Sequence, residues 1–189
     1  MPLTKLDTTT ALIVIDLQKG IATIPTAHPM AEIVARAARL ADAFRERSLP
    51  VVLVNVAGLA PGRTDAGRPN FAFPPDWTEF VPELSPQPGD HAITKQRVGA
   101  FHGTDLDSYL RERGVTQVVI VGVATSFGVE STARSAYDLG YNVTLVVDAM
   151  TDRDAGAHSN CLGKIFPRIA ETGTTDDAMK LLQDFICRN

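Results

Sequence analysis

Compact apolar runs alternate with amphipathic segments along the chain, and this alternation constrains the fold more than any other feature. The first run, TALIVID at residues 10–16, is rich in β-branched residues and ends at a carboxylate, as is typical of a buried parallel strand. Residues 30–48 repeat apolar residues at helical spacing with charged residues between them, which predicts an amphipathic helix. Further strands are expected at 51–56, 91–95, 117–123, 142–148 and 169–171, and further helices at 104–113, 126–139, 154–167 and 175–186.

Strands that alternate with helices build βαβ units, whose right-handed crossovers give a parallel sheet with helices on both faces. We therefore expect an α/β fold, a three-layer α-β-α sandwich of Rossmann-like type. A length of 189 residues is typical of one domain, so residues 1–189 are expected to form a single domain. Ligands of such folds bind beyond the carboxyl ends of the strands. The side chains expected at that edge are Asp16, Asn55, Lys95, residues 122–128 and Asp148.

Charge and composition argue against several classes of partner. The chain has 18 basic and 22 acidic residues, a net charge of −4, whereas duplex-binding domains are usually basic. Its apolar runs are far shorter than the roughly 20 residues of a membrane span, and no signal peptide is recognised. We expect a cytoplasmic protein that binds a small molecule, with neither nucleic acid nor membrane as a partner. The two cysteines, Cys161 and Cys187, are too few for a disulfide framework and are interpreted as reduced thiols.

Residues 57–90 break the pattern. They hold seven of the 12 prolines and show no periodicity. A connection of this length is often a binding loop or a lid, although a surface insertion is an equal alternative. Phe71, Phe73 and Trp77 are candidates to line a pocket, although aromatic residues in loops more often anchor local packing.

The four histidines are scattered, with no pair spaced for one helix face and no cysteine beside them, so no metal and no cofactor are expected. They are His28, His91, His102 and His158.

Asp16 and Lys95 are the candidate catalytic pair, because each ends an expected strand at the same edge of the sheet. Burial raises the pKa of an aspartate and a nearby lysine lowers it, so a carboxylate between these influences can act as a general acid or base. Lys95 can hold this carboxylate or stabilise a developing negative charge. The alternatives are an aspartate that caps the next turn and a solvated lysine.

The segment GVATSFG at 122–128 connects the fourth expected strand to the next helix. The amide groups that open a helix are unpaired, so this turn is a candidate site for an oxyanion or a carboxylate. It is not a dinucleotide-binding loop, because it follows the fourth strand and lacks the GxGxxG spacing.

Three blocks of the sequence resemble those of the isochorismatase-like hydrolase superfamily, also called the cysteine hydrolases. The blocks are ALIVIDLQ at 11–18, ITKQRVGAFHGTDL at 93–106 and VGVATSFGVESTARSAYDLGYNVTLVVDAMTD at 121–152. The resemblance implies a six-stranded parallel sheet in the order 3-2-1-4-5-6, a homodimer or homotetramer, and a cis peptide bond between Val123 and Ala124. Amidohydrolase members use an Asp–Lys–Cys triad, and Asp16 and Lys95 match its first two residues.

Gly128 stands where the cysteine members carry their nucleophile. They read G-V-A-T-N-x-C-V-E and this chain reads G-V-A-T-S-F-G-V-E, so thioester chemistry lacks its nucleophile. Two branches of the superfamily share the glycine: the isochorismatases, which cleave a vinyl ether with one acid, and proteins of the YecD type, whose block is closer to residues 125–134. The resemblance therefore implies non-covalent hydrolysis of a small anionic molecule, with Asp16 as the acid. Its candidate substrate-binding residues are Gln18, Arg97, Ala124, Thr125, Ser126 and Phe127.

Two alternatives stay open. Ser126 could serve as a different nucleophile in an amide or ester hydrolase, although no histidine is placed by the sequence to activate it. The chain could also be a catalytically silent ligand-binding homologue. The metal ligands of the nicotinamidases, which follow the second strand, are missing from residues 55–60, so no catalytic metal is expected.

Overall fold

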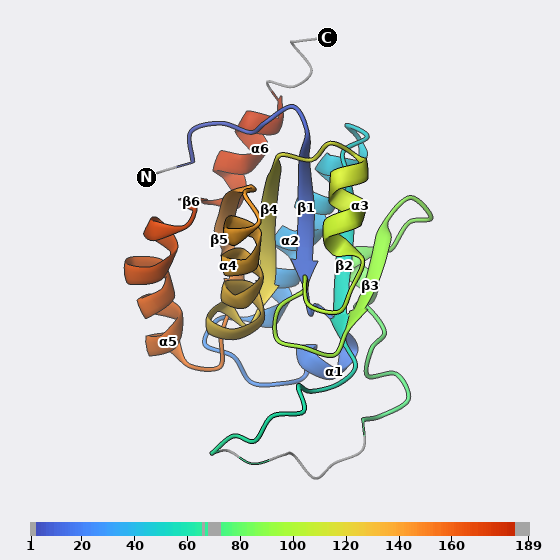
Figure 1. Cartoon of the computed structure of the whole chain (residues 1–189), viewed down its shortest axis with the longest axis vertical. Coiled ribbons are helices and arrows are strands. Elements are labelled where there is room, and N and C mark those ends of the chain that lie inside the picture. Colours follow the sequence, from blue (N-terminus) through green and yellow to red (C-terminus); the bar gives the residue numbers. More distant parts are fainter. Residues whose placement is uncertain (1–2, 66, 68–72, 184–189) are drawn as a thin grey trace.

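Six parallel strands form one sheet in the order β3-β2-β1-β4-β5-β6 (Figure 1). The computed structural model describes residues 3–65, 67 and 73–183. The predicted α/β class, parallel sheet and strand order are confirmed. The strands are β1 (Thr10–Ile15), β2 (Val51–Val56), β3 (His91–Lys95), β4 (Gln117–Val123), β5 (Asn142–Thr151) and β6 (Glu171–Gly173).

Helices cover both faces of the sheet because successive strand residues point to opposite faces. Leu12 and Val14 of β1 pack toward one cluster, with the helices α2 (Met30–Arg45) and α6 (Thr175–Gln183). Ile13 and Ile15 pack toward a second cluster on the other face. This second cluster takes residues from α3 (Leu106–Glu112), α4 (Glu130–Asp138) and the turns η3 (Cys161–Ile165) and η4 (Phe166–Arg168), and α5 (Ala155–Asn160) directly precedes η3. Among the described residues, no helix is long and apolar enough to cross a membrane.

The predicted boundaries hold best for the continuous apolar strands, and those of β2, β3 and β4 are confirmed. The helix expected at 126–139 begins instead with a one-turn π-helix, η2 (Thr125–Val129), before α4. The helix expected at 154–167 is divided into α5, a second π-turn and a 3₁₀ turn. The last strand lies at Glu171–Gly173 rather than at 169–171. Residues 184–186 of the expected last helix, and Cys187, lie outside the described residues.

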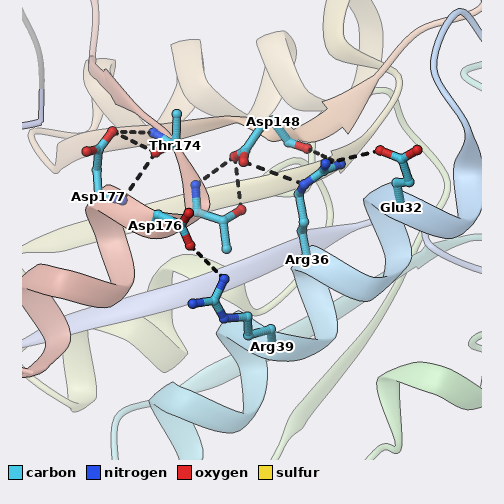
Figure 2. Close-up of polar contacts among 8 residues, drawn as sticks. Glu32, Arg36, Arg39, Asp148, Thr174, Asp176 and Asp177 are labelled. Atoms are coloured by element: carbon cyan, nitrogen blue, oxygen red, sulfur yellow. Dashed lines mark hydrogen bonds and ion pairs between the residues drawn. The ribbon is translucent and has the colours of Figure 1, made fainter.

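Asp148 does not lie at the edge of the sheet where the sequence places it. Strand β5 runs on to Thr151, and its register with β4 shifts between Ile120 and Gly122, so that Asp148 falls within an irregular part of the strand. Its carboxylate accepts hydrogen bonds from the backbone nitrogen and hydroxyl of Thr175, at 2.7 and 2.9 Å, and faces Arg36 of α2 at 3.6 Å (Figure 2). Asp148 therefore joins α2 to α6, and its expected place in the ligand site is wrong.

Candidate active site

A cavity of about 410 Å³ opens at the carboxyl ends of the strands, where the sequence predicts the ligand site. The short helix α1 (Lys19–Ala22) and the connection between β2 and β3 lie at this end of the sheet (Figure 1). Asp16, Lys95 and Gly128 all line the cavity. Its walls are mainly apolar and come from Ile21, Ile24, Val56, Leu59, Phe73, Trp77, Val98, Val123, Ala124 and Phe127.

Asp16 and Lys95 form a buried ion pair at this cavity. The Lys95 Nζ donates to Asp16 Oδ2 at 2.8 Å and to the carbonyl oxygen of Val98 at 2.9 Å, and the two residues are only 6% and 2% exposed. The other carboxylate oxygen, Asp16 Oδ1, is buried and has no hydrogen-bond partner among the described residues. One oxygen is therefore fixed by the lysine, and the other makes no hydrogen bond to any described residue.

Burial raises the pKa of Asp16 to about 6, although the charge and the hydrogen bond of Lys95 oppose the rise. The backbone of Asp16 also lies in the left-handed region, with φ of 55°. Residues other than glycine are uncommon there, and such residues cluster at functional sites. The carboxyl group can thus exchange a proton near neutral pH from a fixed position.

Gly128 packs directly against this carboxylate. A Cβ atom at residue 128 would lie 3.2 Å from Asp16 Oδ2 and 3.1 Å from Ile15 Cγ2. Both distances are shorter than nearly all ordinary Cβ contacts. Residue 128 therefore offers only backbone to this part of the cavity, close to the carboxylate of Asp16.

The turn after β4 differs from the expected anion site. The peptide bond between Val123 and Ala124 is cis, as the resemblance implies. However, the backbone nitrogen of Ser126 donates to Asp152 Oδ2 at 2.7 Å, and that of Phe127 donates to the carbonyl oxygen of Ala124 at 3.0 Å. The amides of Ser126 and Phe127 are therefore satisfied within the chain and are not free for a substrate oxygen. The expectation that amides near Ala124 and Gly128 bind one stays a prediction.

The candidate residues of this turn are divided between the cavity and the protein interior. Ala124 and Phe127 line the cavity, and Phe127 is 59% exposed. Ser126 does not line it, since its hydroxyl donates to Asp152 Oδ2 at 2.8 Å. Thr125 is fully buried, and its hydroxyl is 2.8 Å from His158 Nδ1. Thr125 and Ser126 therefore hold the turn in place, and neither is positioned to contact a ligand.

Two histidines lie beside this turn: His158 contacts Thr125, and His28 packs against His158. The rings of His28 and His158 lie 4.7 Å apart, and His28 Nδ1 is 3.0 Å from the hydroxyl of Thr151. Burial, with a contribution from the charge of His28, lowers the pKa of His158. Among the described residues, no group of three His, Cys, Asp or Glu side chains could hold a metal ion.

Gln18 does not line the cavity, but its side chain binds the backbone of two residues that do, Val56 and Trp77. Its side-chain nitrogen donates to the carbonyl oxygens of Trp77 and Val56, at 2.7 and 3.1 Å, and its oxygen accepts from the Val56 backbone nitrogen at 2.7 Å. The Trp77 ring lies against Gly20, where a Cβ atom would collide with the ring. The prediction that Gln18 binds substrate is therefore wrong, because this buried amide is fully occupied by backbone.

The connection 57–90 contributes to the cavity, as one of its two interpretations predicts. Phe73 and Trp77 both line it, with ring centroids 4.6 Å apart. Phe71 lies outside the described residues. Asn55 does not line the cavity, and its amide nitrogen donates to the Thr78 carbonyl oxygen at 2.8 Å, which ties β2 to this connection.

Arg97 and Arg153 complete the lining, and both side chains are exposed. Arg97 follows β3 and was expected in the site. Arg153 was missed, because the fifth strand was expected to end at Asp148. Ligands of such folds bind beyond the carboxyl ends of the strands. A fifth strand that is extended to Thr151 therefore places Arg153 at the ligand site.

Cys161 is remote from this chemistry. Its thiol is buried and donates to Glu130 Oε2 at 3.0 Å, and it does not line the cavity. Burial and the neighbouring carboxylate raise its pKa to about 12, so it is protonated at neutral pH.

The fold and the site define a doubly wound α/β protein with a buried acid–lysine pair at the carboxyl edge of its sheet. The family model of the isochorismatase domain matches residues 10–177. The chain therefore belongs to the isochorismatase family of hydrolases, as the sequence blocks indicate.

Relatives and solved structures agree with this assignment. The isochorismatase family protein YwoC of Bacillus subtilis is 42% identical over 178 residues, 90% of this chain and 93% of its own. YecD of Escherichia coli O157:H7, described in the same words, is 40% identical over 92% of this chain and 96% of its own. The solved structure of an isochorismatase family protein from Burkholderia thailandensis has a TM-score of 0.91 at 41% identity, covering 95% of this chain and 98% of that one.

A more distant similarity joins the chain to an amide hydrolase. The ureidoacrylate amidohydrolase RutB of Pseudomonas syringae pv. syringae is 29% identical over 174 residues, 74% of this chain and 69% of its own.

Proposed function

We propose that this protein hydrolyses a small anionic molecule by non-covalent acid–base chemistry at Asp16, and that a vinyl ether of the isochorismate type fits this chemistry best. The observation that carries the proposal is the half-paired carboxyl group of Asp16. One oxygen is held 2.8 Å from the Lys95 ammonium, while the other is buried without a partner among the described residues, and Asp16 itself lines the cavity. A general acid needs a fixed position and an oxygen that no other group occupies.

The proposed reaction begins with a proton transfer from Asp16 to the terminal methylene carbon of the enolpyruvyl group. The resulting oxocarbenium ion is attacked by water, which returns a proton to the Asp16 carboxylate. The hemiketal then collapses to pyruvate and the free alcohol. The catalyst is restored, and one water molecule is consumed for each ether bond broken.

Lys95 has two tasks in this scheme. While Asp16 is ionised, the ammonium group stabilises the carboxylate, and throughout the cycle it holds Oδ2 in place while Oδ1 has no partner among the described residues. The apolar walls of the cavity reduce competition from bulk water, which strengthens these electrostatic interactions.

The lining of the cavity supports a non-covalent route. Among its described residues, Thr26 has the only hydroxyl group, which donates to the carbonyl oxygen of His28 at 2.8 Å, and a cysteine is not among them. Cys161 and Ser126 both lie outside the lining and have carboxylate partners.

Amide or ester hydrolysis with a different nucleophile is the second candidate, favoured by the similarity to a ureidoacrylate amidohydrolase. It requires Ser126 to leave Asp152 and enter the cavity. An acyl adduct on Ser126, detected by mass spectrometry after incubation with activated esters, would support this alternative. A ligand that binds tightly without turnover of ethers, esters or amides would instead support a silent binding protein.

The decisive assay is pyruvate release from isochorismate by the wild type, by Asp16→Asn and by the exposed control Asp138→Asn. We expect release by the wild type and the control, and loss of at least a hundredfold in Asp16→Asn, with unchanged circular dichroism showing intact folding. An absence of release from all three proteins would reject the vinyl-ether substrate. Equal release by Asp16→Asn and wild type would reject Asp16 as the acid.

A further inference from the structure

The cavity carries an excess of positive charge that the acid–lysine pair does not explain. Among the described residues that line it, Asp16 provides one carboxylate against the three basic side chains of Lys95, Arg97 and Arg153. Asp16 and Lys95 neutralise each other when both are charged. The two arginines are therefore left as uncompensated cations in an otherwise apolar pocket, although the whole chain has a net charge of −4.

The two arginines approach the site from opposite sides. Arg97 follows β3 and Arg153 follows β5, and each of these strands lies two positions away from β1, which ends at Asp16. Four inter-strand steps of about 4.8 Å separate the two strand ends, a span of about 19 Å. Two long side chains that extend inward from these ends leave a gap that a small molecule can bridge, with its reacting centre above Asp16.

The acidic neighbours of Arg153 are engaged elsewhere. Asp152 accepts hydrogen bonds from the backbone and hydroxyl of Ser126, and Asp154 caps α5 by accepting from the Ala157 backbone nitrogen at 2.8 Å. Neither carboxylate lines the cavity, and within the described part of the chain no ion pair to Arg153 is present. The hydrogen bonds also fix the backbone on both sides of Arg153, which lines the cavity.

Arg97 has a different arrangement. One of its terminal nitrogens donates to the Gln96 carbonyl oxygen at 2.8 Å, which anchors the side chain and leaves its other donors for a ligand. A guanidinium group binds a carboxylate or phosphate through two parallel hydrogen bonds, with more geometric specificity than a lysine provides.

From this arrangement we infer that Arg153 determines substrate specificity by binding a second acidic group, so that the site selects molecules with two acidic groups over molecules with one. Arg97 binds the first group from the β3 side and Arg153 the second from the β5 side. The inference rests on the proposed function for the position of the reacting bond, but the charge selection that it describes is measurable without turnover.

The test uses two unreactive probes, isophthalate and benzoate, which share one ring and differ by one carboxylate. Binding is measured by isothermal titration calorimetry for the wild type, Arg153→Met, Arg153→Lys and Arg39→Met. Arg39 is a matched control, because it is an exposed arginine that pairs with Asp176 and does not line the cavity (Figure 2).

We expect the wild type and Arg39→Met to bind isophthalate about tenfold more tightly than benzoate, a difference of about 1.4 kcal/mol. Arg153→Met should lose this preference while it keeps its affinity for benzoate, and Arg153→Lys should retain part of it. The inference is overturned if Arg153→Met keeps the preference, if the wild type has none, or if neither probe binds. A failure of pyruvate release would reject the vinyl-ether substrate and leave the binding result unchanged, so the two failures are distinguishable.

Discussion

The position of a Cβ atom at Gly128 lies 3.2 Å from the Oδ2 oxygen of Asp16, closer than an ordinary van der Waals contact. This is the oxygen that Lys95 holds at 2.8 Å. A Cβ atom at residue 128 must therefore press on this carboxylate, on the Ile15 side chain and on the Val123 carbonyl oxygen. The glycine therefore makes room for the carboxyl group in its observed position.

Gly128→Ala should lower kcat by about tenfold to a hundredfold, because a small displacement of a catalytic group has effects of that size. The cost in stability should be smaller, about 1–2 kcal/mol, as expected of one extra methyl group in a tight space. Gly163→Ala is the matched control, since a Cβ atom at Gly163 has no neighbour within 4 Å. Steady-state kinetics and urea unfolding check both effects, and an unchanged kcat in Gly128→Ala would contradict the proposed contact.

The pH dependence of the reaction should report the role of Asp16. Burial raises the pKa of this group to about 6, so a general acid in its protonated form is abundant below pH 6 and is depleted above it. We expect kcat/KM to fall about tenfold for each pH unit above 6. The residual activity of Asp16→Asn should not show this decline. A rate that instead rises with pH through this range would assign Asp16 as a general base.

Lys95→Met should strongly destabilise the fold at neutral pH. Removal of one partner from a buried ion pair leaves an uncompensated charge and costs about 3–5 kcal/mol. Lys164→Met, at an exposed lysine, serves as the control and should change the free energy of unfolding by less than about 0.5 kcal/mol.

The sign of the pH effect on this variant follows from Asp16. Its pKa in the folded protein lies above the ordinary value of 3.8, so protonated Asp16 stabilises the fold below pH 3.8, and this contribution is lost as the pH rises through about 6. Without Lys95, the pKa of Asp16 should rise further. The deficit of Lys95→Met in urea unfolding should therefore be large at pH 7 and shrink toward pH 4, and a constant deficit would contradict this explanation.

The sequence predicts the strands of the sheet well, because residues that are neighbours in the sequence are enough to identify them. The continuous apolar runs at β2 and β4 can only be buried strands in this setting, and their boundaries are confirmed. The shared edge of Asp16 and Lys95 also follows from parallel strands. The irregular register of β5 is not local, since it depends on how β4 packs beside it. That irregularity moves Asp148 away from the site and brings Arg153 into it.

The roles of polar residues near the site were harder to predict, because partners far away in the sequence decide them. Ser126 and Asp152 are 26 residues apart, and Thr125 and His158 are 33 apart, yet these contacts determine that neither Ser126 nor Thr125 lines the cavity. A motif gives the residue type and its approximate position. It does not tell whether the side chain faces the ligand or the protein.

Gln18 shows the same limit and leads to a final prediction. Its buried amide makes three hydrogen bonds to the backbone of Val56 and Trp77. Replacement by leucine leaves the Val56 backbone nitrogen without its partner, whereas the two carbonyl oxygens keep the Trp77 indole and the Gly20 backbone nitrogen as donors. One buried group without a partner costs about 1–3 kcal/mol, so we expect Gln18→Leu to be less stable than the wild type by about that amount in urea unfolding.

The effect on catalysis should separate support of the wall from a direct role in binding the substrate. Trp77 lines the cavity, and its indole nitrogen donates to the Val56 carbonyl oxygen at 2.9 Å, so loss of Gln18 should loosen this wall. KM should rise several-fold while kcat changes little, because Asp16 and Lys95 keep their own contacts, and the fluorescence of Trp77 should shift toward that of an exposed indole. Gln87→Leu, at an exposed glutamine, should leave all three quantities unchanged. A raised KM with unaltered fluorescence and stability would instead mean that the Gln18 amide contacts the substrate itself.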